Sequence, residues 1–130
     1  MIEALLVSQE RGRLSILEAA LLKHGMTISH AESGSAATVK TAGQFFDLIV
    51  VDEHLPDMTG LELSRKLVLQ NPMSNISVVS GLSHEDFHEA SEGLGILMQL
   101  PPLPGSDTAG ILIAHLNNIL KITRHREPID

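Results

Sequence analysis

Short apolar runs alternate along the chain with longer stretches in which apolar residues recur at helical spacing. The apolar runs occupy residues 2–7, 26–30, 47–51, 76–80 and 96–100. Residues 4–7, 48–51 and 76–79 are almost continuously apolar, which is typical of strands covered on both faces. The alternation predicts five βα units that form a parallel sheet.

The stretches between these runs predict five helices. Leu14, Leu17 and Leu21 recur at i, i+3 and i+7, and Gly25 ends that first helix. Ser83, followed by Asp86, resembles a capping box. The other signals are Ser33 or Ser35 and Gly43 for the second helix, Thr59, Gly60 and Pro72 for the third, and Leu112, Leu116 and Ile119 for the fifth.

Composition narrows the function classes. A chain of 130 residues has room for one domain with a real core, which we place at residues 1–124, with a polar tail at 125–130. No Cys is present, so disulfides, iron–sulfur clusters and thiol nucleophiles are excluded. The net charge of −7 disfavours nucleic-acid binding, and no stretch has the form of a signal peptide or a membrane span. We therefore expect a cytoplasmic protein.

Polar side chains follow several of the predicted strands. In open parallel sheets, ligands bind at the carboxyl ends of the strands. Those positions hold Ser8, Gln9 and Glu10 after the first strand, Asp52, Glu53 and His54 after the third, Ser80 and Gly81 after the fourth, and Leu100 and Pro101 at the end of the fifth.

The segment 47–63 reads DLIVVDEHLPDMTGLEL. On this segment and the strand ends, the chain resembles the receiver domain of two-component response regulators over essentially its whole length. The resemblance implies an α/β, flavodoxin-like, doubly wound sheet of five parallel strands in the order 2-1-3-4-5, with five helices. It implies that Asp52 is the phosphoacceptor, within a loop that includes His54 and Pro56, and that Ser80-Gly81 is the family's Ser/Thr plus small residue. Leu100-Pro101 falls on the family's Lys-Pro, which implies a cis peptide bond.

The departures from the family pattern concern the chemistry of the site. Ser8 and Gln9 stand where receivers hold Mg²⁺ with an acidic pair, and Leu100 replaces the lysine. Asp52 is then the site's single carboxylate, with no lysine, so we expect weak Mg²⁺ binding unless Glu10 substitutes for the lost pair. Leu97 stands at the place of the aromatic switch residue.

Two interpretations of the site follow. We favour a phosphorylation-independent or weakly phosphorylated interaction module, a pseudo-receiver without enzymatic activity. The alternative is a functional Asp52 phosphoacceptor with an unusual metal site. A structural interpretation stands beside both, in which Asp52 caps nearby backbone N–H groups. For Ser80, capping of the loop before the fourth helix and a switching role are left open as equal alternatives.

The resemblance also indicates partners. The family uses its fourth helix, fifth strand and fifth helix as a binding surface, so we expect a protein partner there, such as a histidine kinase or phosphotransfer protein. A homodimer is a further expectation, and neither a membrane nor a nucleic acid is expected as a partner.

A competing motif belongs to the enzyme class. The segment 84–88 reads HEDFH and matches the zinc-protease pattern H-E-x-x-H through His84, Glu85 and His88. We discount it because it lies at a predicted helix start, carries Asp86 where a buried helix needs an apolar residue, and lacks an obvious third ligand. A flavin or nucleotide site is disfavoured because the loop after the first strand offers one glycine and carries Glu10. A cobalamin site is disfavoured because its motif requires Gly where Asp57 stands and follows the first strand.

Overall fold

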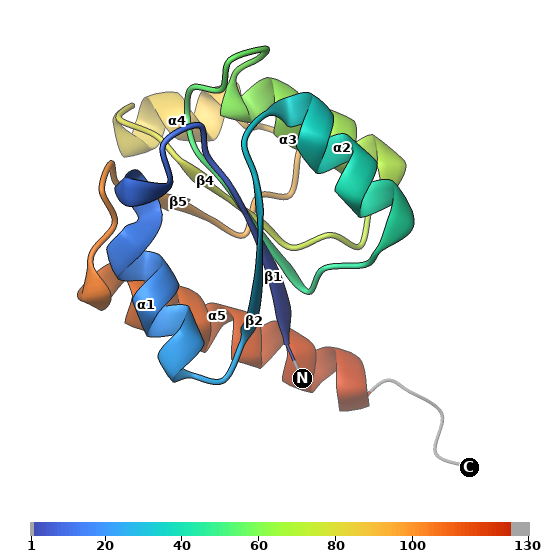
Figure 1. The fold of residues 1–130 in the computed structure, drawn as a ribbon, viewed down its shortest axis with the longest axis vertical. Helices are drawn as coiled ribbons and strands as arrows, with labels where there is room; N and C mark the ends of the chain where they lie inside the picture. Colours follow the sequence, from blue (N-terminus) through green and yellow to red (C-terminus); the bar gives the residue numbers. More distant parts are fainter. Residues whose placement is uncertain (1, 126–130) are drawn as a thin grey trace.

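The computed structural model describes residues 2–125, so the predicted tail lies outside the described residues except for His125. Five strands form one parallel sheet: β1 (Glu3–Val7), β2 (Thr27–Ala31), β3 (Leu48–Val51), β4 (Ile76–Val79) and β5 (Met98–Leu100). Their order is β2-β1-β3-β4-β5, which confirms the predicted topology (Figure 1).

The helices cover both faces of the sheet. A short 3₁₀ helix, η1 (Arg11–Leu14), leads into α1 (Ser15–Lys23), which packs beside α5 (Ser106–His125) on one face. On the other face lie α2 (Gly34–Gly43) and α3 (Gly60–Gln70), and α4 (His84–Ala90) follows β4 near the edge of the sheet (Figure 1). The fold is therefore the doubly wound arrangement that the sequence predicts.

Each central strand sends alternate side chains into two separate cores. In β1, Ala4 and Leu6 join the core under α1 and α5, whereas Leu5 and Val7 join the core under α2 and α3. Successive residues of a strand point to opposite faces of the sheet. Because helices cover both faces, the residues on each face must be apolar, which gives the continuous apolar runs of the sequence.

Polar caps fix where the helices begin. The side chains of Ser33, Thr59 and Ser83 accept hydrogen bonds from the backbone N–H groups of Ala36, Glu62 and Asp86, at 3.0–3.1 Å. Each cap satisfies an N–H group that the helix itself cannot satisfy. Ser33, and not Ser35, is thus the cap of α2.

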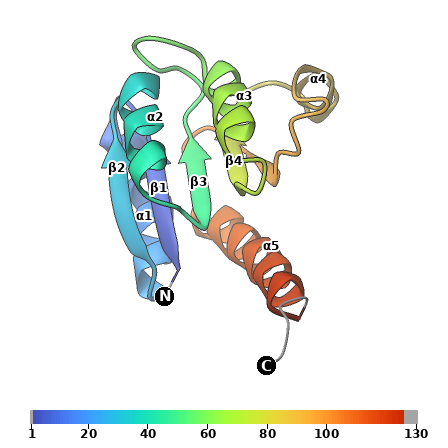
Figure 2. The same ribbon diagram turned by 90° about the vertical axis from the view of Figure 1, so that its right-hand side faces the viewer.

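The sheet register brings the candidate residues to one edge. Just past the strands, Ser8 N donates to Ala31 O, Asp52 N to Val7 O and Ser80 N to Leu100 O, at 2.9–3.0 Å. These bonds extend the strand pairing by one residue, so Ser8, Asp52 and Ser80 lie on neighbouring strands at the carboxyl ends. The arrowheads of β2 and β3 point to that same edge in Figure 2.

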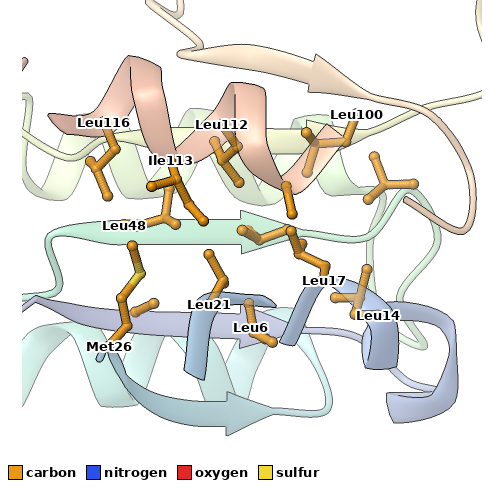
Figure 3. Close-up of a cluster of buried hydrophobic side chains, with 14 residues drawn as sticks. Leu6, Leu14, Leu17, Leu21, Met26, Leu48, Leu100, Leu112, Ile113 and Leu116 are labelled. Atoms are coloured by element: carbon orange, nitrogen blue, oxygen red, sulfur yellow. The ribbon is translucent and has the colours of Figure 1, made fainter. Parts of the chain in front are cut away.

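The peptide bond at the end of β5 differs from the prediction. Leu100 is fully buried in the core under α5 and points into the same layer as Leu112 and Leu17 (Figure 3). No peptide bond in residues 2–125 is cis, so the predicted cis bond between Leu100 and Pro101 is wrong. The trans form is the intrinsically favoured one for an X–Pro bond, by about 0.5–1 kcal/mol.

Within the described part of the chain, no helix has the length and apolar character needed to cross a membrane.

Candidate functional site

The centre of the site is the carboxylate of Asp52, a residue that is 2% exposed at the end of β3. Its Oδ2 accepts hydrogen bonds from Ser8 Oγ at 2.8 Å and from Arg13 Nε at 2.9 Å. Its Oδ1 accepts from the backbone N–H of Glu53 at 2.9 Å and from Arg13 Nη2 at 3.3 Å. Both carboxylate oxygens therefore have two donors each.

Arg13 is the residue that the sequence did not point to. It lies in η1, between β1 and α1, and its side chain is 32% exposed. Nη2 also lies 3.6 Å from Glu53 Oε2. The hydrogen bond to Asp52, and then the charge of Asp52, raise the pKa of Arg13 above its usual value. The site has no lysine, and this contact supplies a cationic side chain that the sequence analysis did not identify.

The side-chain oxygen atoms of this site, in their folded arrangement, do not fit Mg²⁺. Mg²⁺ requires hard oxygen ligands, above all carboxylates, in octahedral geometry. Ser8 Oγ and both Asp52 oxygens are already engaged with protein groups, and Gln9 is exposed. In residues 2–125, no three His, Cys, Asp or Glu side chains are placed to hold a metal ion together.

A small cavity of about 160 Å³ adjoins the carboxylate, lined by Gln9, Glu10, Arg13, Asp52 and His54. Glu10 is exposed, and its backbone contacts Ser8: Glu10 N donates to Ser8 Oγ at 3.2 Å. The cavity is small and bordered by charged groups.

The loop after β4 is tied to the loop after β3. Glu53 Oε1 accepts a hydrogen bond from Gly81 N at 3.1 Å. Ser80 Oγ accepts from Leu82 N at 3.1 Å, and Gln99 Nε2 donates to the carbonyl oxygens of Ser80 and Leu82 at 3.2 and 2.8 Å. The Ser80 hydroxyl thus caps its own loop, and Gln99 was not singled out from the sequence.

The other predicted site residues form no hydrogen bond with the Asp52 carboxylate among those the structure describes. The His54 side chain is 84% exposed, and His54 forms an isolated β-bridge with Thr59. Pro56 and Pro101 are exposed, and Leu97 is half-buried against the core under α5.

The loop that follows Asp52 is also held from α2. The Asp57 carboxylate accepts hydrogen bonds from the N–H groups of Gly34 and Ser35, both at 2.9 Å, and these bonds lower the pKa of Asp57. Gly60 passes so close to the Asp52 carbonyl that a Cβ atom has no room there. The loop therefore has contacts at both ends that fix its path.

The H-E-x-x-H segment forms no metal centre in the described structure. His84, Glu85 and His88 are exposed on α4, a helix of seven residues, and they belong to no cluster of metal-ligating side chains in residues 2–125. His84 and His88 instead border a cavity of about 550 Å³ between α4 and the segment that leads into β5, with Phe87, Leu97 and Met98 also in its lining.

Comparison with known proteins gives a consistent result. The model of the response regulator receiver domain matches residues 4–100. The chain is 31% identical over 101 residues to the sensor protein EvgS of Escherichia coli, which covers 75% of this chain and 8% of that protein. It is 35% identical over 71 residues to the probable transcriptional regulatory protein TcrX of Mycobacterium tuberculosis, covering 55% of this chain and 30% of that protein. The chain thus spans less than a third of these curated relatives.

Solved structures show the same fold. The chemotaxis response regulator CheY4 of Vibrio cholerae superposes with a TM-score of 0.80 at 19% identity, covering 89% of this chain and 98% of that one. The response regulator TrrA of Thermotoga maritima, solved in complex with Mg²⁺–BeF, superposes with a TM-score of 0.76 at 22% identity, covering 89% and 99%. At these identities the likeness concerns the fold.

Proposed function

Because the chain belongs to the response regulator receiver domain family, we propose that it is a two-component signalling module that binds a protein partner without Mg²⁺-dependent phosphorylation of Asp52. In this proposal the domain is a pseudo-receiver in the cytoplasm and has no enzymatic activity of its own. Asp52 holds the position of the phosphoacceptor and serves the structure of the site.

The observation that carries the proposal is the engagement of both Asp52 oxygens. Phosphorylation requires one carboxylate oxygen to attack the phosphorus of a donor while cations neutralise the charge of the transferred group. Here each oxygen already accepts two hydrogen bonds, from Arg13, Ser8 and the Glu53 backbone. Attack by either oxygen therefore requires a hydrogen bond at that oxygen to break first.

The residues around Asp52 support the same proposal. The positions of the family's acidic pair hold Ser8 and Gln9, and Leu100 takes the place of the lysine with its side chain buried in the core. Any Mg²⁺ bound here is therefore weakly held, since carboxylate charge supplies most of its affinity.

For the partner we propose a histidine kinase or a phosphotransfer protein, bound on the surface formed by α4, β5 and α5. Two curated relatives of this chain, EvgS and the aerobic respiration control protein ArcB of Escherichia coli, are named sensor proteins. The cavity between α4 and β5 supports the choice of surface, because it exposes parts of Leu97 and Met98 beside a polar rim of His84 and His88. Apolar side chains with a polar rim are typical of protein interfaces.

Phosphodonor labelling tests this function. The wild-type chain and Asp52→Asn are incubated with acetyl phosphate and Mg²⁺, and the intact mass of each is measured. We expect no phosphoryl adduct in the wild type beyond that of Asp52→Asn. Stoichiometric labelling of the wild type that Asp52→Asn abolishes would overturn the proposal in favour of a functional phosphoacceptor with an unusual metal site.

A further inference from the structure

We infer that Arg13 is a built-in cation that takes the place of a divalent metal ion beside Asp52 and holds the loops of the site in one arrangement. The inference rests on the proposed function and deepens it, because it names the group that makes the module independent of Mg²⁺. Arg13 acts through Asp52 and Glu53, so it is a positioning residue.

The contact between Arg13 and Asp52 has the form of a fork. Nε and Nη2 of one guanidinium meet Oδ2 and Oδ1 of one carboxylate, at 2.9 and 3.3 Å. Such two-point contacts fix the plane and the direction of both groups, which a single point charge does not do. The same Nη2 reaches Glu53, so one cation serves two carboxylates.

The position of Arg13 is specific within its own 3₁₀ helix. Arg11 lies two residues earlier on η1, yet its Nη2 contacts the ring of His30 at 3.1 and 3.2 Å. His30 in turn lies 2.6 Å from Glu18 Oε1. Arg11 therefore belongs to a different and more exposed group of side chains, and it is a matched control for Arg13.

From Arg13 a chain of contacts leads to the loop after β4. Glu53 faces Arg13 with Oε2 and accepts the Gly81 N–H with Oε1. The Gln99 side chain then holds the carbonyl oxygens of Ser80 and Leu82 from β5. Side chains and backbone of the protein thus connect the three loops of the site.

Arg13 and a divalent ion compete for the same oxygens. A metal ion beside Asp52 needs carboxylate oxygens that Arg13 now occupies, and its double charge would be placed next to the guanidinium. Removing Arg13 takes one hydrogen bond from each Asp52 oxygen, at a cavity that Glu10 also borders, and it removes the cation beside Glu53. The loss of the cation is therefore expected to create affinity for Mg²⁺.

The experiment is a Mg²⁺ titration of the full chain, followed by the amide NMR signals of Asp52, Glu53 and Gly81. The proteins are the wild type, Arg13→Gln, Arg13→Lys and Arg11→Gln. We expect Arg13→Gln to bind Mg²⁺ at least about 10-fold more tightly than the wild type, on the scale at which neighbouring groups tune metal sites. Arg13→Lys and Arg11→Gln are expected to stay close to the wild type, the former because its charge remains.

Unchanged Mg²⁺ affinity in Arg13→Gln overturns the inference, as does an equal gain in Arg13→Lys. If Arg13→Gln does not fold in metal-free buffer, its far-UV circular dichroism is followed as Mg²⁺ is added. Refolding then supports the inference, and a failure to refold overturns it. Phosphodonor labelling of the same wild-type sample keeps the two proposals apart, since stoichiometric labelling overturns the proposed function whatever the Arg13 variants do.

Discussion

The pairing of Arg13 with Asp52 is expected to contribute measurably to the free energy of unfolding. The perturbation is a double-mutant cycle of Arg13→Gln and Asp52→Asn. Each single change breaks the fork, and the double variant places two neutral amides where the two charges stood. The cycle isolates the energy with which the two side chains interact.

The structure sets the size of this coupling. The Asp52 side chain is 3% exposed and that of Arg13 is 32% exposed, so the pair is neither fully buried nor on the open surface. Exposed ion pairs contribute about 0.2–1 kcal/mol, and breaking a fully buried pair costs about 3–5 kcal/mol. Because solvent reaches Arg13, we expect a coupling between these limits, about 1–3 kcal/mol, in line with hydrogen bonds to charged groups.

The assay is urea unfolding at pH 7 in buffer with EDTA, with the unfolding free energy extrapolated to zero denaturant. The control cycle is Arg11→Gln with Asp52→Asn, which is expected to be additive within about 0.5 kcal/mol because Arg11 contacts His30. A coupling between Arg13 and Asp52 no larger than that of the control cycle would refute the reasoning.

Further predictions concern the loop and the core. Asp57 has a pKa below its ordinary value of 3.8, so its contribution to stability is present at neutral pH and is lost as pH falls below about 4. The melting temperature of Asp57→Asn should therefore lie below that of the wild type at pH 7 and approach it at pH 3. The same difference in melting temperature at both pH values would contradict this. Leu100→Ala is expected to destabilise the fold by about 2–5 kcal/mol in urea unfolding, because it leaves a cavity in the core; a loss below about 1 kcal/mol would show that Leu100 does not pack as described. Gly60→Ala is expected to lower the free energy of unfolding by about 1–3 kcal/mol, since the added Cβ would meet the Asp52 backbone. Gly43→Ala is the control, because its Cβ would have open space around it, and it should leave the stability unchanged. Equal effects of the two changes would exclude the clash.

The fold could be predicted because the hydrophobic pattern of the sequence indicates which strands are buried on both faces. The runs at 4–7, 48–51 and 76–79 reflect strands with a helix layer on each face. The fifth strand is shorter than its apolar run, since β5 begins at Met98 whereas Ile96 and Leu97 pack against the two cores just before it. An apolar run indicates which side chains are buried. Because side chains just outside the hydrogen-bonded strand are buried too, the run is longer than the strand.

The role of Arg13 was not predictable from spacing. Its backbone lies in a 3₁₀ turn, whose direction depends on local packing, and its long side chain reaches a strand 39 residues further along the sequence. The sequence signal was the loss of the acidic pair and the lysine, which indicated a changed charge balance but not the group that restores it. A search for basic residues in the segment between the first strand and the first helix would have found both Arg11 and Arg13.

Ser80 illustrates a similar limit. Its position at the end of β4 follows from the pattern, whereas the partner of its hydroxyl depends on the turn of the loop. In the structure that hydroxyl accepts the N–H of Leu82, and the loop is held in addition by Gln99. The capping role is the one that the geometry supports.

The central claim is that the Asp52 oxygens are not available to a metal ion and a phosphoryl group. Beryllofluoride, a mimic of the phosphoryl group, tests this claim most directly. The ¹H–¹⁵N NMR spectrum of the wild type is recorded before and after the addition of Mg²⁺ and beryllofluoride. We predict unchanged amide signals for Asp52, Glu53, Ser80 and Gly81, because the Asp52 oxygens are held by Arg13, Ser8 and the Glu53 backbone. Saturable shifts of these signals would contradict the central claim, since they would show that the site accepts a metal ion with a phosphoryl group.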